Sequence, residues 1–234
     1  MSNNEIKENL ELIRTSIKEV CEQCGRDPKE VTLVAVSKTK PNEMIEEALR
    51  WDQLHFGENR MQELQSKMDE IEHAGIQWHM IGTMQSNKIK YIAEKVHWIH
   101  SVSKAKYLNE IEKRAKDAGR TINVLIQVNI SGEDQKSGCE PSQLASILEH
   151  AKTLDHVRVR GLMGMATNVD DPEEVRPEFA LLKQVLEDHT HLNGKNVALT
   201  ELSMGMTNDY KVAIEEGATM VRIGSAIFGS RNYA

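Results

Sequence analysis

The sequence predicts an α/β fold, a single (β/α)8 TIM barrel with an extra N-terminal helix. Short apolar segments rich in β-branched residues alternate with amphipathic segments along all 234 residues. Counting them gives eight strand–helix pairs of about 29 residues each, which is the size of one βα unit. No linker rich in proline, glycine or serine interrupts the alternation. Residues 1–234 are therefore predicted to form one domain.

The expected strands are short apolar runs, which is typical of parallel strands buried on both faces. The clearest is INVLIQVNI, at 122–130. The expected strands span residues 31–36, 53–56, 76–82, 96–102, 122–130, 157–165, 197–204 and 218–224. A doubly wound open sheet would produce the same alternation, so it remains the alternative fold.

The expected helices carry apolar side chains three or four positions apart. The first spans residues 5–24, and Gly25 is expected just beyond its end. Asn42 is the expected N-cap of a helix over 43–50, and Pro141 is expected to begin a helix. The other expected helices span 58–74, 86–95, 104–119, 141–154, 172–191 and 208–217, and a short one follows the last strand.

Composition excludes several functional classes. Lys plus Arg total 29 and Asp plus Glu total 36, a net charge of −7, which does not suit duplex nucleic acid as the main partner. No apolar run approaches the ~20 residues of a membrane span, and the polar N-terminus does not look like a signal peptide. The 3 cysteines cannot form a disulfide framework, so a cytoplasmic location is expected.

No metal site is expected. Cys21 and Cys24 form a C-x-x-C, but a zinc site would need a second pair and Cys139 stands alone. The histidines show no metal-binding spacing, and His79 is expected to be a hydrogen-bonded core residue. A packing role for Cys21 and Cys24 is therefore favoured over a redox role.

In a barrel of this kind, functional groups lie at the carboxyl ends of the strands. Lys38 follows the first strand and shares a face with Val34 and Val36. If that face lines the barrel, Lys38 points into its mouth, where partial desolvation favours the neutral amine that a Schiff base needs. Taken alone, however, a solvated lysine at a strand end is the simpler interpretation.

A phosphate site commonly follows the seventh and eighth strands of such barrels. Here those strands end at Ser203 and at Gly224-Ser225, small residues that let backbone N–H groups approach an anion. Helix capping is the alternative for either segment. Arg222 can bond a pyridine ring nitrogen, or alternatively form an ion pair with Glu201. Together with Lys38, these residues predict a site for pyridoxal 5′-phosphate (PLP).

Seven blocks carry a family resemblance. They are AVSKTKP (35–41), FGENRMQE (56–63), WHMIGTMQSNK (78–88), VLIQVNISGEDQKSG (124–138), RGLMGM (160–165), LSMGMTND (202–209) and MVRIGSAIFGSR (220–231). The chain resembles the PLP homeostasis protein family, the bacterial relatives of the proline synthetase co-transcribed homolog. The resemblance extends from about residue 5 to the C-terminus.

The resemblance implies a barrel like the N-terminal domain of alanine racemase, with PLP held as a Schiff base. The residues it implies for PLP binding are Lys38 for the Schiff base, Ser203, Gly224 and Ser225 for the phosphate, Arg222 for the pyridine nitrogen, and Asn59 and Met165 beside the ring. It also implies a lysine near the cofactor path, Lys136.

The resemblance further implies intracellular PLP (vitamin B6) homeostasis, by buffering PLP or delivering it to PLP-dependent apo-enzymes, without catalysis. An arginine at the ring nitrogen disfavours its protonation and makes the ring a poorer electron sink. A monomer is expected, because the chain shows no counterpart of the second domain of the racemases. The alternatives are a fold-type III PLP enzyme with weak racemase or lyase activity, and a Schiff-base aldolase without a cofactor.

Overall fold

The strands close into a parallel barrel in the order β1 to β8. The structure, a computed structural model, describes residues 3–132 and 137–229. The strands are β1 (Thr32–Val36), β2 (His55–Glu58), β3 (Gln77–Met80), β4 (Trp98–Val102), β5 (Ile122–Gln127), β6 (Val157–Met163), β7 (Val197–Ser203) and β8 (Met220–Ile223). β8 pairs with β1 in parallel, with Arg222 opposite Val34, which closes the barrel. The predicted TIM barrel is confirmed, and the open-sheet alternative was wrong.

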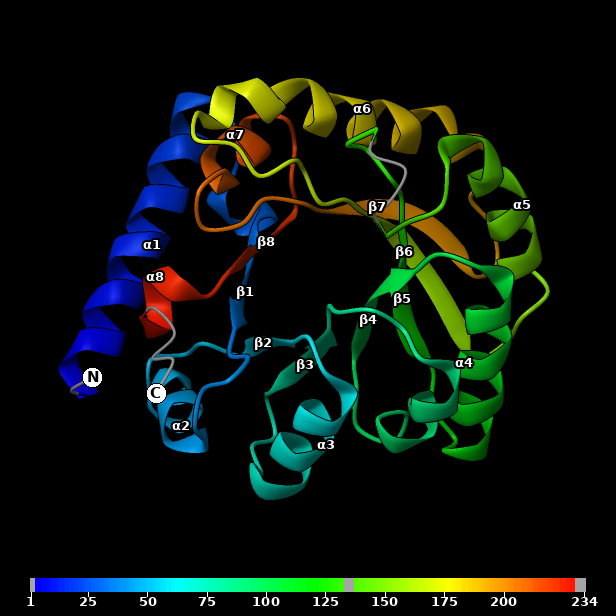
Figure 1. The fold of residues 1–234 in the computed structure, drawn as a ribbon, viewed down its shortest axis with the longest axis horizontal. Helices are drawn as coiled ribbons and strands as arrows, with labels where there is room; N and C mark the ends of the chain where they lie inside the picture. The colour runs from blue at the N-terminus through cyan, green and yellow to red at the C-terminus, as the bar shows by residue number, and fades with distance from the viewer. Residues whose placement is uncertain (1–2, 133–136, 230–234) are drawn as a thin grey trace.

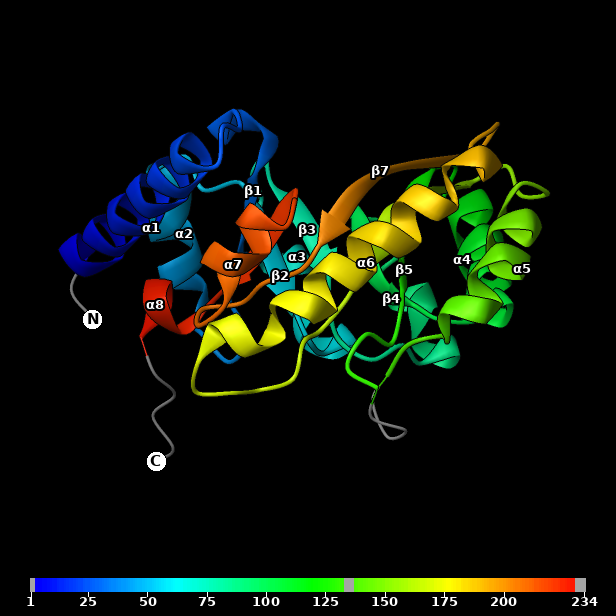
Figure 2. The same cartoon turned by 90° about the horizontal axis from the view of Figure 1, so that it is seen from above.

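Helices surround the strands on the outside, as Figures 1 and 2 show. The α-helices are α1 (Asn3–Gln23), α2 (Asn42–Arg50), α3 (Met61–Glu70), α4 (Ala105–Asp117), α5 (Pro141–Ala151), α6 (Arg176–Asp188), α7 (Tyr210–Glu215) and α8 (Ser225–Phe228). The short 3-10 segments are η1 (Pro28–Glu30), η2 (Ser86–Tyr91), η3 (Pro172–Val175) and η4 (Thr190–Leu192).

The extra helix α1 lies beside α2 and α8 in the outer ring (Figure 1). Its predicted apolar face is buried throughout: Ile6, Leu10, Ile13, Ile17 and Val20. Asn9 Nδ2 donates to the carbonyl oxygen of Ile227 over 3.0 Å, and the hydroxyl of Tyr210 donates to Ser16 over 2.8 Å. α8 has only 4 residues and covers little of the barrel. The apolar face of α1 covers the barrel beside it.

Asn42 is not the N-cap of α2, contrary to prediction. Pro41 takes that position with extended backbone angles, and Asn42 is the first helical residue. The Asn42 side chain instead donates to Glu70 Oε2 at the end of α3, over 2.7 Å. Asn42 thus makes a tertiary contact through its amide nitrogen, and Pro41 at the N-cap position supplies no side-chain acceptor.

Three expected helices are shorter than the hydrophobic pattern indicated. The one expected over 58–74 begins at Met61, because Glu58 is still part of β2. The one expected over 86–95 is the 3-10 segment η2. The one expected over 172–191 is divided into η3, α6 and η4. Apolar periodicity identified these segments but not their ends, which depend on tertiary contacts.

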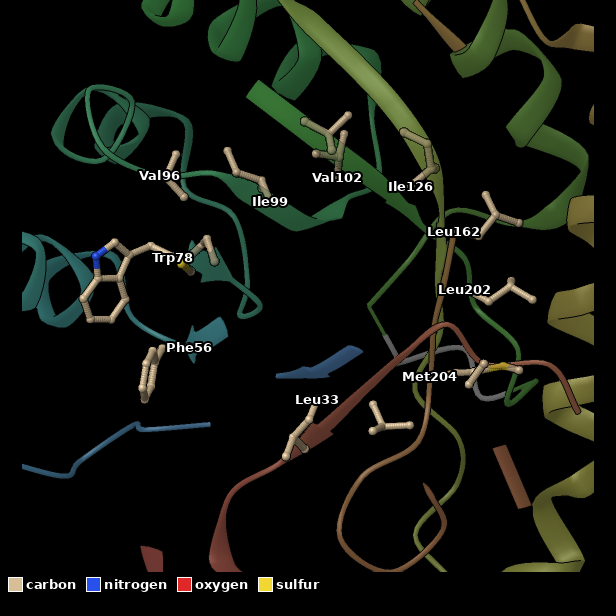
Figure 3. Packing of buried hydrophobic residues seen from close by; sticks show 14 of the residues in the cluster. Leu33, Phe56, Trp78, Val96, Ile99, Val102, Ile126, Leu162, Leu202 and Met204 are labelled. Carbon is tan, nitrogen blue, oxygen red and sulfur yellow. The ribbon is translucent and has the colours of Figure 1, made fainter. Parts of the chain in front are cut away.

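The core has two layers. The larger layer lies between the strands and the helices and includes Phe56, Trp78, Ile99 and Leu162, which are shown in Figure 3. The smaller layer lies inside the barrel and consists of Val34, Leu125, Met163 and Met220, with Trp98 packed against it. This second layer fills part of the barrel interior, so the polar groups near it sit among apolar neighbours.

Candidate functional site

A cavity of about 570 Å³ opens at the carboxyl ends of the strands. That volume is within the range of small-molecule and cofactor sites. Its wall contains residues that directly follow β1, β2, β3, β6, β7 and β8. Six of the seven predicted site residues line it: Lys38, Asn59, Met165, Arg222, Gly224 and Ser225. The fold therefore brings together residues that are far apart in the sequence.

Lys38 reaches this cavity through the side-chain alternation of β1. Val34 belongs to the apolar cluster inside the barrel, and Val36 lines the cavity, as Lys38 does. Lys38 is half-buried. Val34, Val36 and Lys38 therefore lie on one face of β1, as predicted. Lys38 lies just beyond the two valines.

The turn that carries Lys38 is tied to β2 and α3 by a buried cluster. Ser37 Oγ donates to Glu58 Oε1 over 2.6 Å. Lys67 Nζ donates to the carbonyl oxygen of Ser37, to Glu58 Oε1 and to Glu63 Oε1, each over 2.8 Å. Glu63 also accepts from the backbone N–H of Thr39 over 2.5 Å. These bonds hold the backbone on both sides of Lys38.

Glu58 is fully buried in this cluster, at 0 % exposure. Burial raises the pKa of Glu58 to about 6, although the ammonium of Lys67 acts in the opposite direction. Its second carboxylate oxygen, Oε2, is buried without a hydrogen-bond partner among the residues that the structure describes. Removing Lys67 would leave a buried, unpaired carboxylate, which is costly.

Arg222 is also buried, and its hydrogen bonds go to neutral acceptors. Nη1 donates to Ser203 Oγ over 2.6 Å, and Nη2 donates to the carbonyl oxygen of Gly164 over 3.0 Å. The alternative ion pair with Glu201 is not formed, because Glu201 accepts from Thr219 instead. Burial lowers the pKa of Arg222 to about 10, with Asp209 acting in the opposite direction, so the guanidinium is charged at neutral pH.

Ser203 is the predicted site residue that does not line the cavity. Its side chain is fully buried at the end of β7, where it accepts from Arg222 and lies 2.9 Å from His100 Nδ1. The structure therefore does not bring its hydroxyl into the wall of the cavity where the phosphate is predicted to bind. The side chain faces the barrel interior at this strand position, beneath the residues that form the cavity wall.

Gly224 and Ser225 lie where β8 meets α8. A Cβ at Gly224 would come within 2.9 Å of the carbonyl oxygen of Val36, so glycine allows β8 to pass close to β1. Ser225 is the first residue of α8, and its hydroxyl lies 3.3 Å from that of Thr207. The first N–H groups of a helix lack partners within the helix. This corner of the cavity therefore combines hydroxyl groups with backbone donors.

A second cavity of about 310 Å³ adjoins the first and shares Asn59, Ile81 and Met165 with it. Arg60 and Lys88 line this second cavity. The wall between β2 and β3 depends on Gly82, where a Cβ would come 2.0 Å from the carbonyl oxygen of Asn59. Asn59, Ile81 and Met165 therefore border both cavities.

The first cavity also contains six residues that are not among the seven predicted site residues: Val36, Lys40, Ile81, Met206, Thr207 and Gly229. Lys40 had a usable signal, because it lies two positions after Lys38. Its Nζ donates to the carbonyl oxygen of Gly229 over 3.0 Å, and burial lowers its pKa. Ile81, Met206 and Thr207 follow strand ends as well, whereas Val36 ends β1 and Gly229 follows α8. Lys136, expected near the cofactor path, lies outside the described residues.

Other motifs contribute nothing to this site. Cys21 is buried, Cys24 is exposed, and Cys24 Sγ donates to the carbonyl oxygen of Cys21. Within residues 3–132 and 137–229, no three His, Cys, Asp or Glu side chains are grouped as metal ligands. In the same ranges, no helix combines the length and apolar character needed to cross a membrane.

Known proteins similar to this chain agree with the geometry. The alanine racemase N-terminal domain family matches residues 5–232. The chain is 41% identical over 226 residues to a pyridoxal phosphate homeostasis protein of Aquifex aeolicus, covering 97% of this chain and 98% of that one. It is 39% identical to a protein of the same name from Escherichia coli K12, covering 99% of each.

Solved structures show the same fold. PipY of Synechococcus elongatus, solved with PLP bound, is 33% identical, with a TM-score of 0.83 over 96% of this chain and 100% of that one. Alanine racemase of Clostridium difficile is 15% identical, with a TM-score of 0.74 over 98% of this chain and 57% of that one, and shares the fold. The chain therefore belongs to the family of the pyridoxal phosphate homeostasis proteins, built on the alanine racemase N-terminal domain.

Proposed function

We propose that this protein binds PLP in the cavity at the barrel mouth and holds it as a Schiff base on Lys38. The observation that carries the proposal is that Lys38, Arg222 and the Gly224-Ser225 corner line one cavity. These groups match three of the polar groups of PLP, namely its aldehyde, its ring nitrogen and its phosphate. The residues present therefore fit the cofactor.

Lys38 supplies the nucleophile. Its amine condenses with the aldehyde of PLP, so that a C=N bond forms and one water leaves. The reaction needs the neutral amine, and Lys38 lies half-buried in the cavity wall beside the apolar side chain of Val36. The cluster of Ser37, Glu58 and Lys67 holds the turn in place while the side chain of Lys38 reaches the cavity.

Arg222 faces the ring. Its charged guanidinium can donate an N–H to the pyridine nitrogen but cannot accept a proton from it, so the nitrogen stays unprotonated. A bound PLP supplies an electron sink for carbanions, and that sink is weaker when the ring nitrogen is not protonated. Arg222 therefore favours holding the cofactor over using it for catalysis.

The phosphate is assigned to the corner where β8 meets α8. Ser225 offers a hydroxyl and the start of α8 offers backbone N–H groups. Thr207 lies beside Ser225 and adds a second hydroxyl. Met165 and Asn59 are assigned to the sides of the ring, since both line the same cavity.

In this proposal the protein buffers intracellular PLP and delivers it to PLP-dependent apo-enzymes in the cytoplasm, as a monomer and without catalytic turnover. Two relatives that cover nearly the whole chain are named as PLP homeostasis proteins. The cavity opening at the barrel mouth gives the cofactor a route out, which a donor requires.

Absorption spectroscopy tests binding. Adding PLP to the purified protein is expected to produce the visible band of a Schiff base, and Lys38→Arg is expected to abolish that band with little change in thermal stability. Lys40→Arg is the matched control and should keep the band. Absence of the band in the unaltered protein would contradict the proposal.

A second experiment separates carriage from catalysis. The loaded protein is incubated with small amino acids in deuterated water, and exchange of the α-hydrogen is followed by NMR. The proposal expects no exchange that depends on Lys38, but transfer of PLP to an apo-enzyme that regains activity. Sustained exchange that Lys38→Ala abolishes would instead favour a racemase or lyase. Formation of a Schiff base with carbonyl compounds but not with PLP would favour an aldolase.

A further inference from the structure

A chain of hydrogen bonds crosses the barrel and ends at Arg222. Arg222 donates to Ser203 Oγ, and Ser203 Oγ lies 2.9 Å from His100 Nδ1. His100 Nε2 lies 2.8 Å from His79 Nδ1, and His79 Nε2 lies 3.0 Å from His55 Nδ1. The chain links five strands, from the amino end of β2 to β8.

The direction of this chain follows from chemistry. A guanidinium has only donors, so Ser203 Oγ must accept from Arg222. The buried hydroxyl proton of Ser203 needs an acceptor, and His100 Nδ1 is the hydrogen-bond partner among the described residues that can accept it, in one of the two neutral tautomers of His100. His100 therefore carries its proton on Nε2 and donates to His79, and His79 donates in the same way to His55. In each of these hydrogen bonds the donor is therefore the residue nearer to Arg222.

The histidines suit this arrangement because they are neutral. Burial lowers the pKa of His79 and of His100 well below its ordinary value, and lowers that of His55 less. The His79 ring also stacks on Trp98, with 2° between the ring planes, which restrains its rotation. A second proton on His79 or His55 would place two ring N–H donors face to face, and a second proton on His100 would remove the acceptor of the Ser203 hydroxyl, so neutral rings in a fixed tautomer suit these bonds.

The series of hydrogen bonds compensates the buried charge of the Arg222 guanidinium. In the described part of the protein Arg222 bonds to neutral acceptors, and a buried cation needs compensation. Hydrogen bonds aligned in one direction polarise one another and direct their negative ends toward the guanidinium. These hydrogen bonds therefore add to the stabilisation that the Asp209 carboxylate gives the charge of Arg222 through space, and Arg222 keeps hydrogen bonds to neutral acceptors.

We propose that Ser203, His100, His79 and His55 are positioning residues for Arg222. Their chain fixes the guanidinium so that a remaining N–H points into the cavity, toward an aromatic nitrogen acceptor. This inference rests on the proposed function only for the identity of that acceptor, the ring nitrogen of PLP. The hydrogen bonds themselves are formed by side chains of the protein and need no ligand.

NMR of the ligand-free protein tests the chain directly. In 15N spectra of the imidazoles, His79 and His100 are expected to be neutral, protonated on Nε2 and not on Nδ1. The N–H signals of the Arg222 guanidinium are expected to exchange slowly with water. Protonation of either histidine on Nδ1, or on both nitrogens, at neutral pH would overturn the inference whether or not PLP binds.

Variants test the positioning role. Ser203→Ala and His100→Phe break the chain, and each is expected to speed exchange of the Arg222 N–H groups and weaken PLP binding about tenfold. Ser203→Thr keeps a hydroxyl, and His100→Asn keeps an acceptor near the position of Nδ1, so both are expected to restore slow exchange and binding. Because His100→Asn loses the bond to His79, its restoration is expected to be partial, and His79→Phe is expected to have a smaller effect in the same direction. His97→Asn is the control, because His97 accepts from the backbone of Trp78 and is not part of these hydrogen bonds.

The outcomes distinguish a failure of the positioning role from a failure of the proposed PLP binding. If the unaltered protein forms the Schiff base but Ser203→Ala changes neither the Arg222 exchange nor PLP affinity, the inference fails and the proposed function stands. If no Schiff base forms, the proposed function fails, and the Arg222 signals of the ligand-free variants still decide the inference. Should His100→Phe not fold, Ser203→Ala decides the same point, because it removes fewer atoms and breaks the same connection.

Discussion

The guanidinium of Arg222 donates a 2.6 Å hydrogen bond to the hydroxyl of Ser203, and both side chains are buried. Ser203 therefore acts on the cavity through Arg222. Only Arg222 of the pair lines the cavity wall. The orientation of one charged group thus depends on a residue that a bound ligand would not touch.

Replacing Arg222 is the first test of this arrangement. Arg222→Gln leaves Ser203 and the carbonyl oxygen of Gly164 without their charged donor, and we expect PLP binding to weaken at least tenfold. The free energy of unfolding should fall by about 1–3 kcal/mol, the cost of buried polar groups that lose a partner. Titration with PLP and urea unfolding measure the two effects. Arg158→Gln, at an exposed position of β6, should change neither.

Lys67 provides a stability prediction. Lys67→Met leaves the buried Glu58 carboxylate unpaired, so the free energy of unfolding should fall by about 3–5 kcal/mol. Adding Glu58→Gln should recover part of this loss, because the uncompensated charge is then gone. Lys95→Met, which breaks an exposed pair with Asp69, should cost less than about 1 kcal/mol. Equal losses for Lys67→Met and Lys95→Met would refute the role given to the cluster.

Glu58 also predicts a pH dependence. Its pKa is raised to about 6 in the folded protein, against an ordinary value of 4.5, because burial disfavours the carboxylate. The folded state therefore holds this proton more tightly, and the stability it contributes below pH 4.5 is lost as the pH rises through about 6. Unfolding curves of the unaltered protein and of Glu58→Gln should diverge over this window. A constant difference between them would contradict the raised pKa.

Gly82 tests the shape of the cavity wall. A Cβ at this position would lie 2.0 Å from the carbonyl oxygen of Asn59, so Gly82→Ala must displace backbone and should cost about 1–3 kcal/mol. Because Asn59 lines the cavity, PLP binding should weaken as well. Gly75→Ala is the matched control, with side-chain neighbours at an ordinary 3.5 Å. Thermal melts and PLP titrations of both variants measure the difference.

Most of the fold was predictable because strand burial leaves a clear pattern. In the run 122–130 every second residue from Ile122 to Ile130 is apolar and Leu125 adds an apolar side chain on the other face, a pattern typical of a strand covered by a ring of helices. Closure was not predictable from pattern alone, because an open sheet has the same alternation; the pairing of Val34 with Arg222 decides it. Asn42 shows the limit for helix ends, since its side chain bonds to Glu70, which is distant in sequence.

The site could be predicted where a residue with distinctive chemistry lies at or near the end of a strand. Lys38 and Arg222 carry distinctive chemistry and follow the alternation of their strands, so barrel geometry and the family resemblance led to them. Ser203 also ends a strand, but its side chain faces inward, and a strand end alone does not give the direction of that residue's hydroxyl. The histidine chain was missed because its members are spread over β2, β3 and β4 without any common spacing.

Reduction with borohydride followed by peptide mapping tests the central claim most directly. The purified protein is mixed with PLP, reduced and digested, and the lysine that carries the phosphopyridoxyl group is identified by mass spectrometry. The account predicts a label confined to Lys38, with Lys40 and Lys88 unlabelled. A label spread over several lysines, or placed mainly on a lysine other than Lys38, would contradict it.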